Sequence, residues 1–369
     1  MRTVAIGIAA IAVLVGAPAL AADMPVKAAP ATPVVFSNGF YVWADGSYQS
    51  VTLPTFDLGW RRLGAAGSTA TESYDPKAKG AGVAGAIGYI FSTGPSVFGS
   101  NVRVEFGASY VEAKASQSGA GTFVAGSNNG IALLGRSTVS DAWSCGPPCG
   151  TTSTLKSNYT AWQLNAKAAS DFQSGAFTFT PSVIVFAGNS RNAQDFSQFF
   201  FLDSGSLLAD IFNAHSTLNW TDWGAKLAAS GKYDVTNWLA FGLGGNIGFA
   251  GRNASLSAND AVTDVFFAIP NNTSSLNVSA NTVPLLANAE ASFVIKACAT
   301  CAIRAFAGLN YDSRVPGISA PNFSSITFLG GPPQSTPSGI KFSSETSYYI
   351  GGGLTVTFNP GVGALASLR

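Results

Sequence analysis

Side chains of alternating polarity recur along this chain, and this pattern constrains its fold more than any other feature. Residues 101–111 show it best, because Val102, Phe106 and Tyr110 fall on one face while Arg103 and Glu105 fall on the other. Successive side chains of a β-strand point to opposite faces, so the pattern indicates a strand. Similar segments are 158–171, 220–233, 238–250 and 346–358, and weaker ones are 38–50, 80–91, 177–189, 284–297 and 302–311. The sequence therefore predicts about ten strands.

The connections between these segments alternate between long and short. The long ones are residues 51–79, 115–157, 190–219, 251–283 and 312–344, and the short ones are 92–100, 173–176, 234–237 and 298–301. Outer-membrane barrels have this layout, with short periplasmic turns and long extracellular loops. Residues 131–134 and 262–269 are candidates for further strands, so eight or twelve strands remain possible.

The composition favours a surface that faces lipid. Only 11% of the residues are charged, 47% are hydrophobic and 41 are glycine, whereas soluble domains are about 25% charged. No run of about 18 apolar residues supports a membrane-spanning helix, and without helices only a closed barrel satisfies the backbone in hydrocarbon. The prediction is an all-β fold, a single antiparallel transmembrane β-barrel over residues 37–369. A secreted β-sandwich also alternates, but it would not systematically pair long loops with four-residue turns.

The N-terminus has the features of a secretory signal peptide. Arg2 precedes an apolar run of 12 residues, and Ala19-Leu20-Ala21 supplies small residues for cleavage after Ala21. The run is short for a membrane anchor. Residues 1–21 are therefore expected to be a signal peptide. Residues 22–36, rich in proline and alanine, are expected to form an extended periplasmic linker.

The start of the mature chain is similar to that of a known group of proteins. Residues 21–28 read AADMPVKA, a Pro/Ala linker follows, and the first strand begins Asn38-Gly39-Phe40-Tyr41. This order resembles that of alphaproteobacterial outer-membrane β-barrel proteins, although Trp43-Ala44 stands where a glycine is usual. The last strand, with Val356 and Phe358 in alternation, resembles the signal read by the outer-membrane assembly machinery. The resemblance implies an integral outer-membrane protein, in some cases a porin or major outer-membrane protein, in others a structural protein or surface antigen.

The charge pattern disfavours several classes of function. The formal net charge is +1, so no basic excess is available to neutralise nucleic acid. The chain has a single histidine, His215, which disfavours metalloenzymes and most histidine-based catalysis. His215 and Ser216 could suggest an esterase, but neighbouring strand residues point apart. We expect no enzyme activity, catalytic residue, cofactor or metal.

A sparse set of charged residues is expected on the inward face of the barrel. They are Arg103, Glu105, Lys167, Asp222, Lys226, Glu290, Lys296 and Arg304. They could line a pore and tune ion passage, or they could form salt bridges that fill a narrow interior. Inward glycines, such as Gly242 and Gly351, would leave part of the wall bare and favour the pore.

The four cysteines form two local pairs. Cys145 and Cys149 are expected in the longest loop, and Cys298 and Cys301 in a periplasmic turn. Both compartments permit disulfides, so two local bridges are expected. A redox role for C-x-x-C would need a thioredoxin-like βαβ context, which is missing.

Together these patterns predict an integral protein of the bacterial outer membrane. The first expected function is a porin-like passive channel for small hydrophilic solutes. The alternative is a non-conducting structural or surface-interaction barrel that presents long extracellular loops. The expected partners are outer-membrane lipid and lipopolysaccharide, the outer-membrane assembly machinery and, if the barrel conducts, small solutes.

Overall fold

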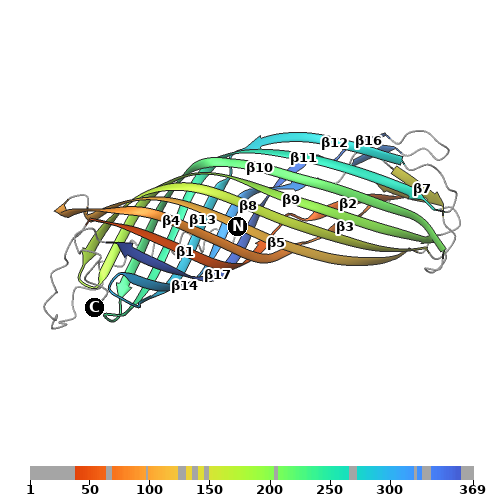
Figure 1. Ribbon diagram of the computed structural model, residues 1–369. Helices are drawn as coiled ribbons and strands as arrows, with labels where there is room; N and C mark the ends of the chain where they lie inside the picture. The colour runs from red at the N-terminus through yellow and green to blue at the C-terminus, as the bar shows by residue number, and fades with distance from the viewer. Residues whose placement is uncertain are drawn as a thin grey trace, which may run out of the picture.

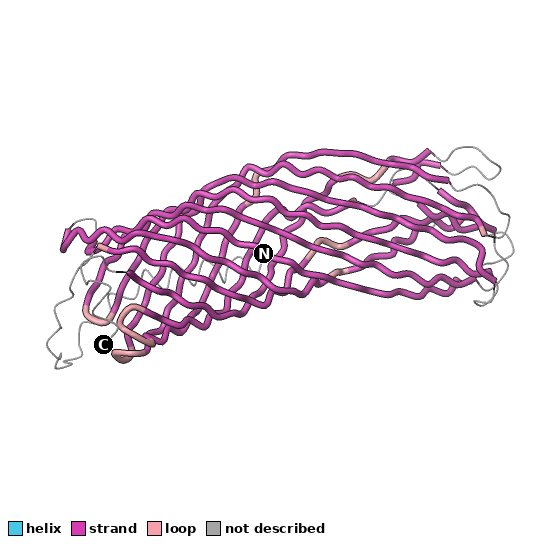
Figure 2. Tube along the Cα trace, viewed as in Figure 1, coloured by secondary structure: helices cyan, strands magenta, loops and turns pink. Residues whose placement is uncertain are grey.

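The computed structural model describes residues 38–63, 69–96, 99–123, 130–134, 140–144, 149–202, 207–265, 272–319, 322–325 and 334–358. Nearly all of these residues belong to β-strands (Figure 2). None of them forms a helix that is long and apolar enough to cross a membrane. The expected signal peptide (1–21) and linker (22–36) lie outside the described residues.

Ten strands close into an antiparallel ring. They are β1 (Gly39–Thr52), β4 (Lys77–Ser96), β5 (Gly99–Phe123), β8 (Cys149–Ser174), β9 (Phe177–Leu202), β10 (Leu207–Asp234), β11 (Leu239–Asp264), β13 (Leu285–Lys296), β14 (Cys301–Ile318) and β17 (Ile340–Phe358). The same sheet contains an eleventh strand, β12 (Asn272–Thr282). A break at Val283-Pro284 separates β12 from β13, and both strands pair with β11. The prediction of a single barrel of about ten strands is confirmed.

Six short strands lie outside the ring. Four of them form a separate sheet, namely β2 (Phe56–Leu63), β3 (Thr69–Tyr74), β6 (Gly130–Leu134) and β7 (Ser140–Ser144). The other two, β15 (Asn322–Ser325) and β16 (Gln334–Thr336), pair with each other. Residues 131–134, considered as a possible further barrel strand, thus belong to β6 and not to the ring.

The strands are strongly staggered around the ring. Following paired residues from Phe40 through all ten strands leads to Thr346 of β17, whose carbonyl accepts a hydrogen bond from the hydroxyl of Thr52. The path therefore returns to β1 twelve residues beyond its start. Such a stagger accompanies strands tilted by roughly 35–45° from the barrel axis, and the strands run obliquely along an elongated barrel (Figure 1).

An apolar belt surrounds the barrel along half of its length, next to the short turns that connect β8 to β9 and β10 to β11. On β10, for example, Trp223 and Leu227 point outward and are 69% and 66% exposed. Exposed aromatic residues mark the two edges of the belt: one edge has Tyr48, Tyr110, Trp162, Trp223, Phe249 and Tyr348, and the other has Phe40, Phe91, Phe172, Phe177, Tyr233 and Phe358. The belt spans about 9–11 residues of each strand, the length that crosses a bilayer.

Other aromatic residues near the strand ends lie inside the barrel. They are Tyr41, Trp43, Tyr159, Trp220 and Tyr349, which have the inward parity of their strands. Strand parity, and not distance from the strand end, decides which face a side chain occupies.

Beyond the belt, the apolar side chains move from the outer to the inner face. On β10 the interior positions are Lys226 within the belt and Asp222 at its upper edge, but Leu218 and Trp220 above it. The exterior changes in the opposite sense, from Trp223 to polar residues such as Thr217. This part of the barrel, which we call the extension, therefore has a hydrophobic interior and a polar surface, as a water-soluble β-domain has.

The extension is built from residues that the sequence assigns to long loops. Strands β5 and β8 to β11 contain 25 to 28 residues each, more than twice the length of the belt. Most of residues 190–219 and 251–283, and both ends of residues 115–157, were expected as loops but continue these strands and the neighbouring β12. The long connections are thus largely ordered sheet.

Two buried clusters fill the base of the extension. The first contains Leu218, Trp220, Ala254, Leu256, Ala258 and Ile318, against which Tyr159, Leu276, Ile340 and Phe342 pack. The second contains Leu53, Ala78 and Ala113. Ile318 comes from the end of β14, after an irregularity of register between Asp312 and Val315. Side chains from opposite walls thus meet across the barrel.

The separate sheet is connected to the inner face of the extension through Tyr74 of β3. The Tyr74 hydroxyl is hydrogen-bonded to Ser153 of β8, and its ring lies edge-on to Phe196 of β9, with 5.8 Å between ring centroids. Phe196 in turn contacts Phe212 of β10. Tyr74, at the end of β3, therefore packs against the inner face of the extension.

Replacing Phe196 by alanine should destabilise the extension by about 3–5 kcal/mol, because Phe196 is 1% exposed and its removal leaves a cavity. Urea unfolding followed by tryptophan fluorescence measures the effect. The control is Ser197→Ala, whose side chain lies on the outer face and should cost less than about 1 kcal/mol. Equal losses in the two variants would contradict the inward packing of this strand.

Candidate functional site: the barrel interior

The eight charged residues expected on the inward face lie on the interior side of their strands, because their positions have the opposite parity to the exposed apolar residues of the same strands. They gather in clusters at different depths of the barrel, each with partners from several strands. We describe these as the lower, middle and upper clusters, counted from the periplasmic turns toward the extension.

The lower cluster surrounds Glu105 of β5. Its carboxylate accepts hydrogen bonds from the hydroxyl of Tyr41 (2.9 Å) and from the indole Nε1 of Trp43 (3.0 Å), both on β1. Lys167 of β8 is the directly paired residue on the neighbouring strand. A buried carboxylate with two donors and a nearby ammonium group is well satisfied.

The remaining predicted residues at this end also have acidic partners. Arg103 forms an ion pair with Asp171 (2.6 Å), which also accepts from Thr180. Lys296 of β13 lies 3.1 Å from Asp234 of β10, and β11 lies between these two strands. These contacts tie nearby strands together close to the periplasmic turns.

The middle cluster is centred on Arg304 of β14. Its guanidinium group contacts Asp45 of β1 and Glu290 of β13, the latter at 3.0 Å. The hydroxyl of Tyr349 donates to Glu290 at 3.0 Å, and the guanidinium lies 4.4 Å from the ring centroid of Phe306. The cluster therefore joins both strands beside β17 across the interior.

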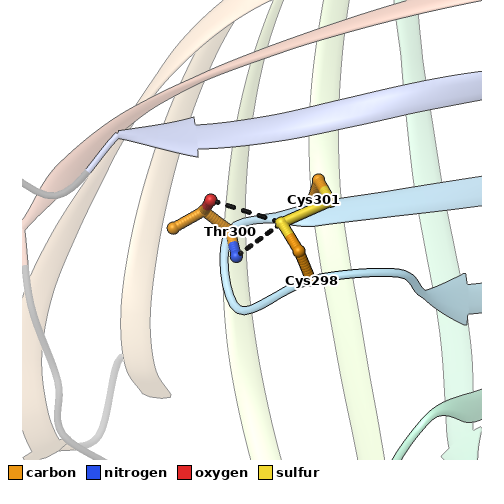
Figure 3. Close-up of a disulfide and its surroundings, with 3 residues drawn as sticks. All are labelled: Cys298, Thr300 and Cys301. Carbon is orange, nitrogen blue, oxygen red and sulfur yellow. Dashed lines mark hydrogen bonds between the residues drawn. A yellow bond between two sulfur atoms is a disulfide. The ribbon is translucent and has the colours of Figure 1, made fainter. Parts of the chain in front are cut away.

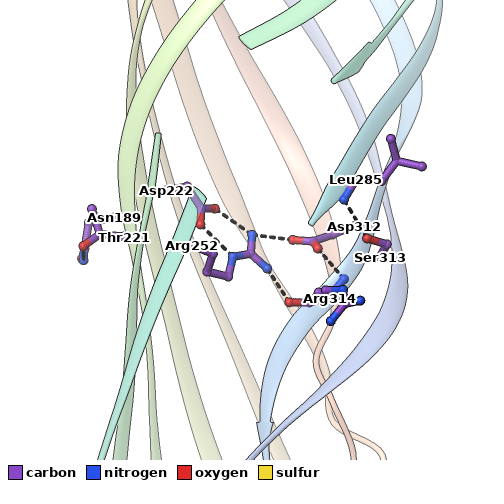
Figure 4. A network of polar contacts seen from close by, with 8 residues as sticks. All are labelled: Asn189, Thr221, Asp222, Arg252, Leu285, Asp312, Ser313 and Arg314. Carbon is purple, nitrogen blue, oxygen red and sulfur yellow. Dashed lines mark hydrogen bonds and ion pairs between the residues drawn. The ribbon is translucent and has the colours of Figure 1, made fainter. Parts of the chain in front are cut away.

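The upper cluster is centred on Arg252 of β11, which is 3% exposed (Figure 4). Its guanidinium makes two hydrogen bonds of 2.7 Å to Asp222 of β10 and one of 2.7 Å to Asp312 of β14. It also donates to the carbonyl of Arg314 at 2.6 Å, and Trp220 lies beside it. Arg252 thus holds β14 close to its irregularity of register.

Glu345 of β17 lies next to the upper cluster, paired with Asp312. Its carboxylate accepts a hydrogen bond of 3.0 Å from Ser343. Burial, with a further contribution from the nearby Asp75 and Asp312 carboxylates, raises the pKa of Glu345 despite that hydrogen bond. This acid is therefore protonated more readily than an ordinary glutamate.

A cavity of about 500 Å³ lies between the middle and upper clusters. Its polar lining includes Gln49, Gln163, Lys226, Asn246 and Asn288. The ammonium group of Lys226 is 4.6 Å from the ring centroid of Phe186, a cation–π distance. The interior at membrane level is thus polar but only partly filled.

The sequence suggested that the inward glycines leave part of the wall bare. In the structure they do not. A Cβ atom on Gly353 would collide with the carboxylate of Asp45, and one on Gly351 would collide with the ring of Phe306. A Cβ on Gly242 would meet Ser292. These glycines give space to inward side chains of neighbouring strands.

The periplasmic turn between β13 and β14 contains a disulfide between Cys298 and Cys301 (Figure 3). The backbone N–H of Thr300 donates to the sulfur of Cys298 at 3.4 Å. This bridge agrees with the prediction. The other expected pair is not described, because Cys145 lies outside the described residues and the side chain of Cys149, at the start of β8, is not described.

His215 and Ser216 lie on opposite faces of β10. Ser216 is buried in the extension, whereas His215 is exposed and its Nδ1 lies 2.5 Å from Asp195 of β9. The sequence argument that neighbouring strand residues point apart therefore holds. It did not anticipate the Asp195 partner, which depends on the pairing of β9 with β10.

Several interior residues were missed by the sequence interpretation. Asp45, Asp171 and Asp234 lie in or at the end of predicted segments, but only the cross-strand register shows that they pair with Arg304, Arg103 and Lys296. Arg252 and Asp312 fall in segments expected to be loops. Their opposite charges carry no signal of contact in a single sequence.

Comparison with known proteins gives limited similarity. No protein family model and no curated protein matches the chain. Among solved structures, the outer-membrane protease OmpT from Escherichia coli is 13% identical, with a TM-score of 0.43, over 86% of this chain and 97% of OmpT. The CymD monoaromatic hydrocarbon channel also matches, with 8% identity and a TM-score of 0.28 over 88% of this chain and 90% of CymD. An anion-selective porin from Comamonas acidovorans matches with 8% identity and a TM-score of 0.12 over 87% of this chain and 99% of the porin.

The class of the protein follows from its own architecture. A closed ring of ten antiparallel strands, an outward apolar belt of membrane thickness and aromatic residues at both belt edges define an outer-membrane β-barrel.

Proposed function

We propose that the protein is a non-conducting outer-membrane barrel that anchors a closed β-domain at the cell surface. The observation that carries this proposal is the filled base of the extension. There, Leu218, Leu256 and Ile318 come from three strands of the ring and pack together in the path that a solute would follow. A water-filled pore would need polar or open space at this level.

The arrangement of the interior charges supports the same proposal. Arg103, Arg252 and Arg304 each contact at least one carboxylate of another strand. These ion pairs join strands that are adjacent or two apart in the ring, and the paired side chains occupy part of the barrel interior. On this view the predicted lumen residues have a structural role.

A porin-like channel for small hydrophilic solutes is the second candidate. The polar cavity of about 500 Å³ at membrane level favours it. Conduction would require the hydrophobic contacts above the cavity, or the lower cluster beneath it, to open.

Single-channel recording in a planar bilayer tests the two candidates. We expect no stable openings from refolded protein whose insertion is verified by heat-modifiable migration on a gel. Stable openings whose ion selectivity changes in Arg103→Glu or Lys226→Glu would refute the closed barrel and establish the porin. A matched exterior variant, Thr217→Glu, should leave any openings unaltered.

The cellular context belongs to the same proposal. A cleaved signal peptide over residues 1–21 would deliver the chain to the periplasm. The outer-membrane assembly machinery would then read the last strand, and outer-membrane lipid would surround the belt. No catalytic function is proposed.

A further inference from the structure

Five basic side chains gather on the outer surface of β4, β5, β8 and β9. They are Lys77, Lys79, Lys114, Lys156 and Arg191, and all five are exposed. They occupy alternate positions on the face that carries the apolar belt lower on the same strands. We call these five residues the basic patch.

The basic patch begins directly above the belt. Tyr110 of β5 and Trp162 of β8 are paired and form the belt edge here. Lys114 lies four residues beyond Tyr110 on β5, and Arg191 lies two residues beyond Asn189, the partner of Trp162 on β9. The patch is therefore at the depth where lipid headgroups meet the barrel.

Within the patch, positive charge exceeds negative charge. Lys79 and Lys114 are directly paired residues of like charge, an arrangement that is unfavourable by itself. Glu112 forms an ion pair with Lys114, at 2.8 Å. Asp195 is the residue paired with Lys156, but its carboxylate contacts His215. Lys77, Lys79, Lys156 and Arg191 form no ion pair with any other described residue.

The neighbouring sector of the extension, formed by β10, β11 and β12, has a different surface. The exterior positions of β10, β11 and β12 above the belt are almost all uncharged, and they include Thr217, Asn219, Asn253, Ser255, Ser257, Asn259, Ser279 and Asn281. A general need for solubility would distribute charge around the barrel. The concentration of basic residues in one sector instead indicates an anionic partner on that side.

We propose that the basic patch binds the phosphate groups of an anionic glycolipid in the outer leaflet. This goes beyond the proposed function and requires only that the belt lies in the outer membrane. Basic side chains at a membrane surface bind anionic headgroups, each contributing independently to the affinity. Tyr110 and Trp162 would contact the acyl boundary of the same lipid, below its phosphates.

Titration of refolded, lipid-free protein in detergent with purified lipopolysaccharide of short core tests the proposal. The variant carries Lys79→Gln, Lys156→Gln and Arg191→Gln, and we expect its affinity to fall by roughly 100-fold. The control carries Asn277→Glu, Ser279→Glu and Asn281→Glu on β12. It makes the same change in net charge on β12, outside the patch, and its affinity should fall by less than about threefold.

Two further ligands separate the sources of phosphate. Dephosphorylated lipopolysaccharide should bind the native protein as weakly as intact lipopolysaccharide binds the patch variant. Equal binding of the two forms, an equal loss in the β12 control, or full displacement by millimolar inorganic phosphate would overturn the proposal. Heat-modifiable migration checks that each variant is folded, and conductance tests the proposed function separately.

Discussion

Replacement of Arg252 by methionine is expected to destabilise the barrel by about 3–5 kcal/mol. The substitution leaves Asp222 and Asp312 facing each other in a largely buried site without the guanidinium that bridges them at 2.7 Å. It also removes the donor to the Arg314 carbonyl, which helps to hold β14 in place. Urea unfolding of the refolded protein, followed by tryptophan fluorescence, measures the change.

The triple variant Arg252→Met, Asp222→Asn, Asp312→Asn tests the physical cause. Because it removes both carboxylate charges together with the guanidinium, it should recover most of the lost stability. Arg191→Met, on the outer surface, is the control for loss of an arginine and should change stability by less than about 0.5 kcal/mol. If the triple variant were less stable than the single one, the charge argument would be wrong.

Replacement of Leu227 by arginine should destabilise the inserted barrel by about 2–4 kcal/mol. Leu227 lies in the middle of the outward face of β10 within the belt and is 66% exposed. A guanidinium group there would lie near the bilayer midplane. The measurement is the urea midpoint of refolding into phospholipid vesicles, with the folded fraction read from heat-modifiable migration.

Thr217→Arg is the matched control, because Thr217 is on the same strand and the same outward face, ten residues above Leu227. In water an arginine at this position should change stability by less than about 0.5 kcal/mol. The difference between the two variants therefore locates the membrane boundary along β10. Similar effects at both positions would show that the belt does not mark the bilayer.

Within the belt, the sequence was sufficient to predict the fold. An outward Phe106 beside an inward Glu105 gives a period of two, and the same contrast identifies four other ring strands clearly and the remaining five more weakly. Four-residue separations such as 173–176 identify the turns, where Gly175 adopts a positive φ of 58° in a two-residue hairpin. Closure followed from the need to satisfy every backbone group in lipid.

Above the belt, the same reasoning failed for a physical reason. The solvent outside changes from lipid to water, so the apolar residues of β10 move from outward positions such as Trp223 to inward ones such as Leu218. Short polar residues like Thr217 and Asn219 then occupy the outer face and resemble a loop in composition. The alternation persists above the belt, but there the polar side chains face outward and the apolar side chains face inward. A search for strands whose apolar side chains always face outward therefore ends at the membrane surface.

The interior clusters were predicted only in part. The inward positions of Arg103, Glu105 and Arg304 follow from strand parity. Their partners depend on which residues of neighbouring strands are paired, and a single sequence does not contain that register. Arg252 and Asp312 were missed for the additional reason that their segments were taken as loops.

The hydrophobic contacts of the first cluster lie at the base of the extension, many residues below the described ends of β9 and β10 at Leu202 and Leu207. The closure proposed above therefore depends on residues far along the chain from these strand ends. Insertions or exchanges of sequence at the tips should leave the permeability barrier of the cell intact. If the proposed closure holds, the ends of these strands are suitable positions for carrying foreign peptide segments on a bacterial surface.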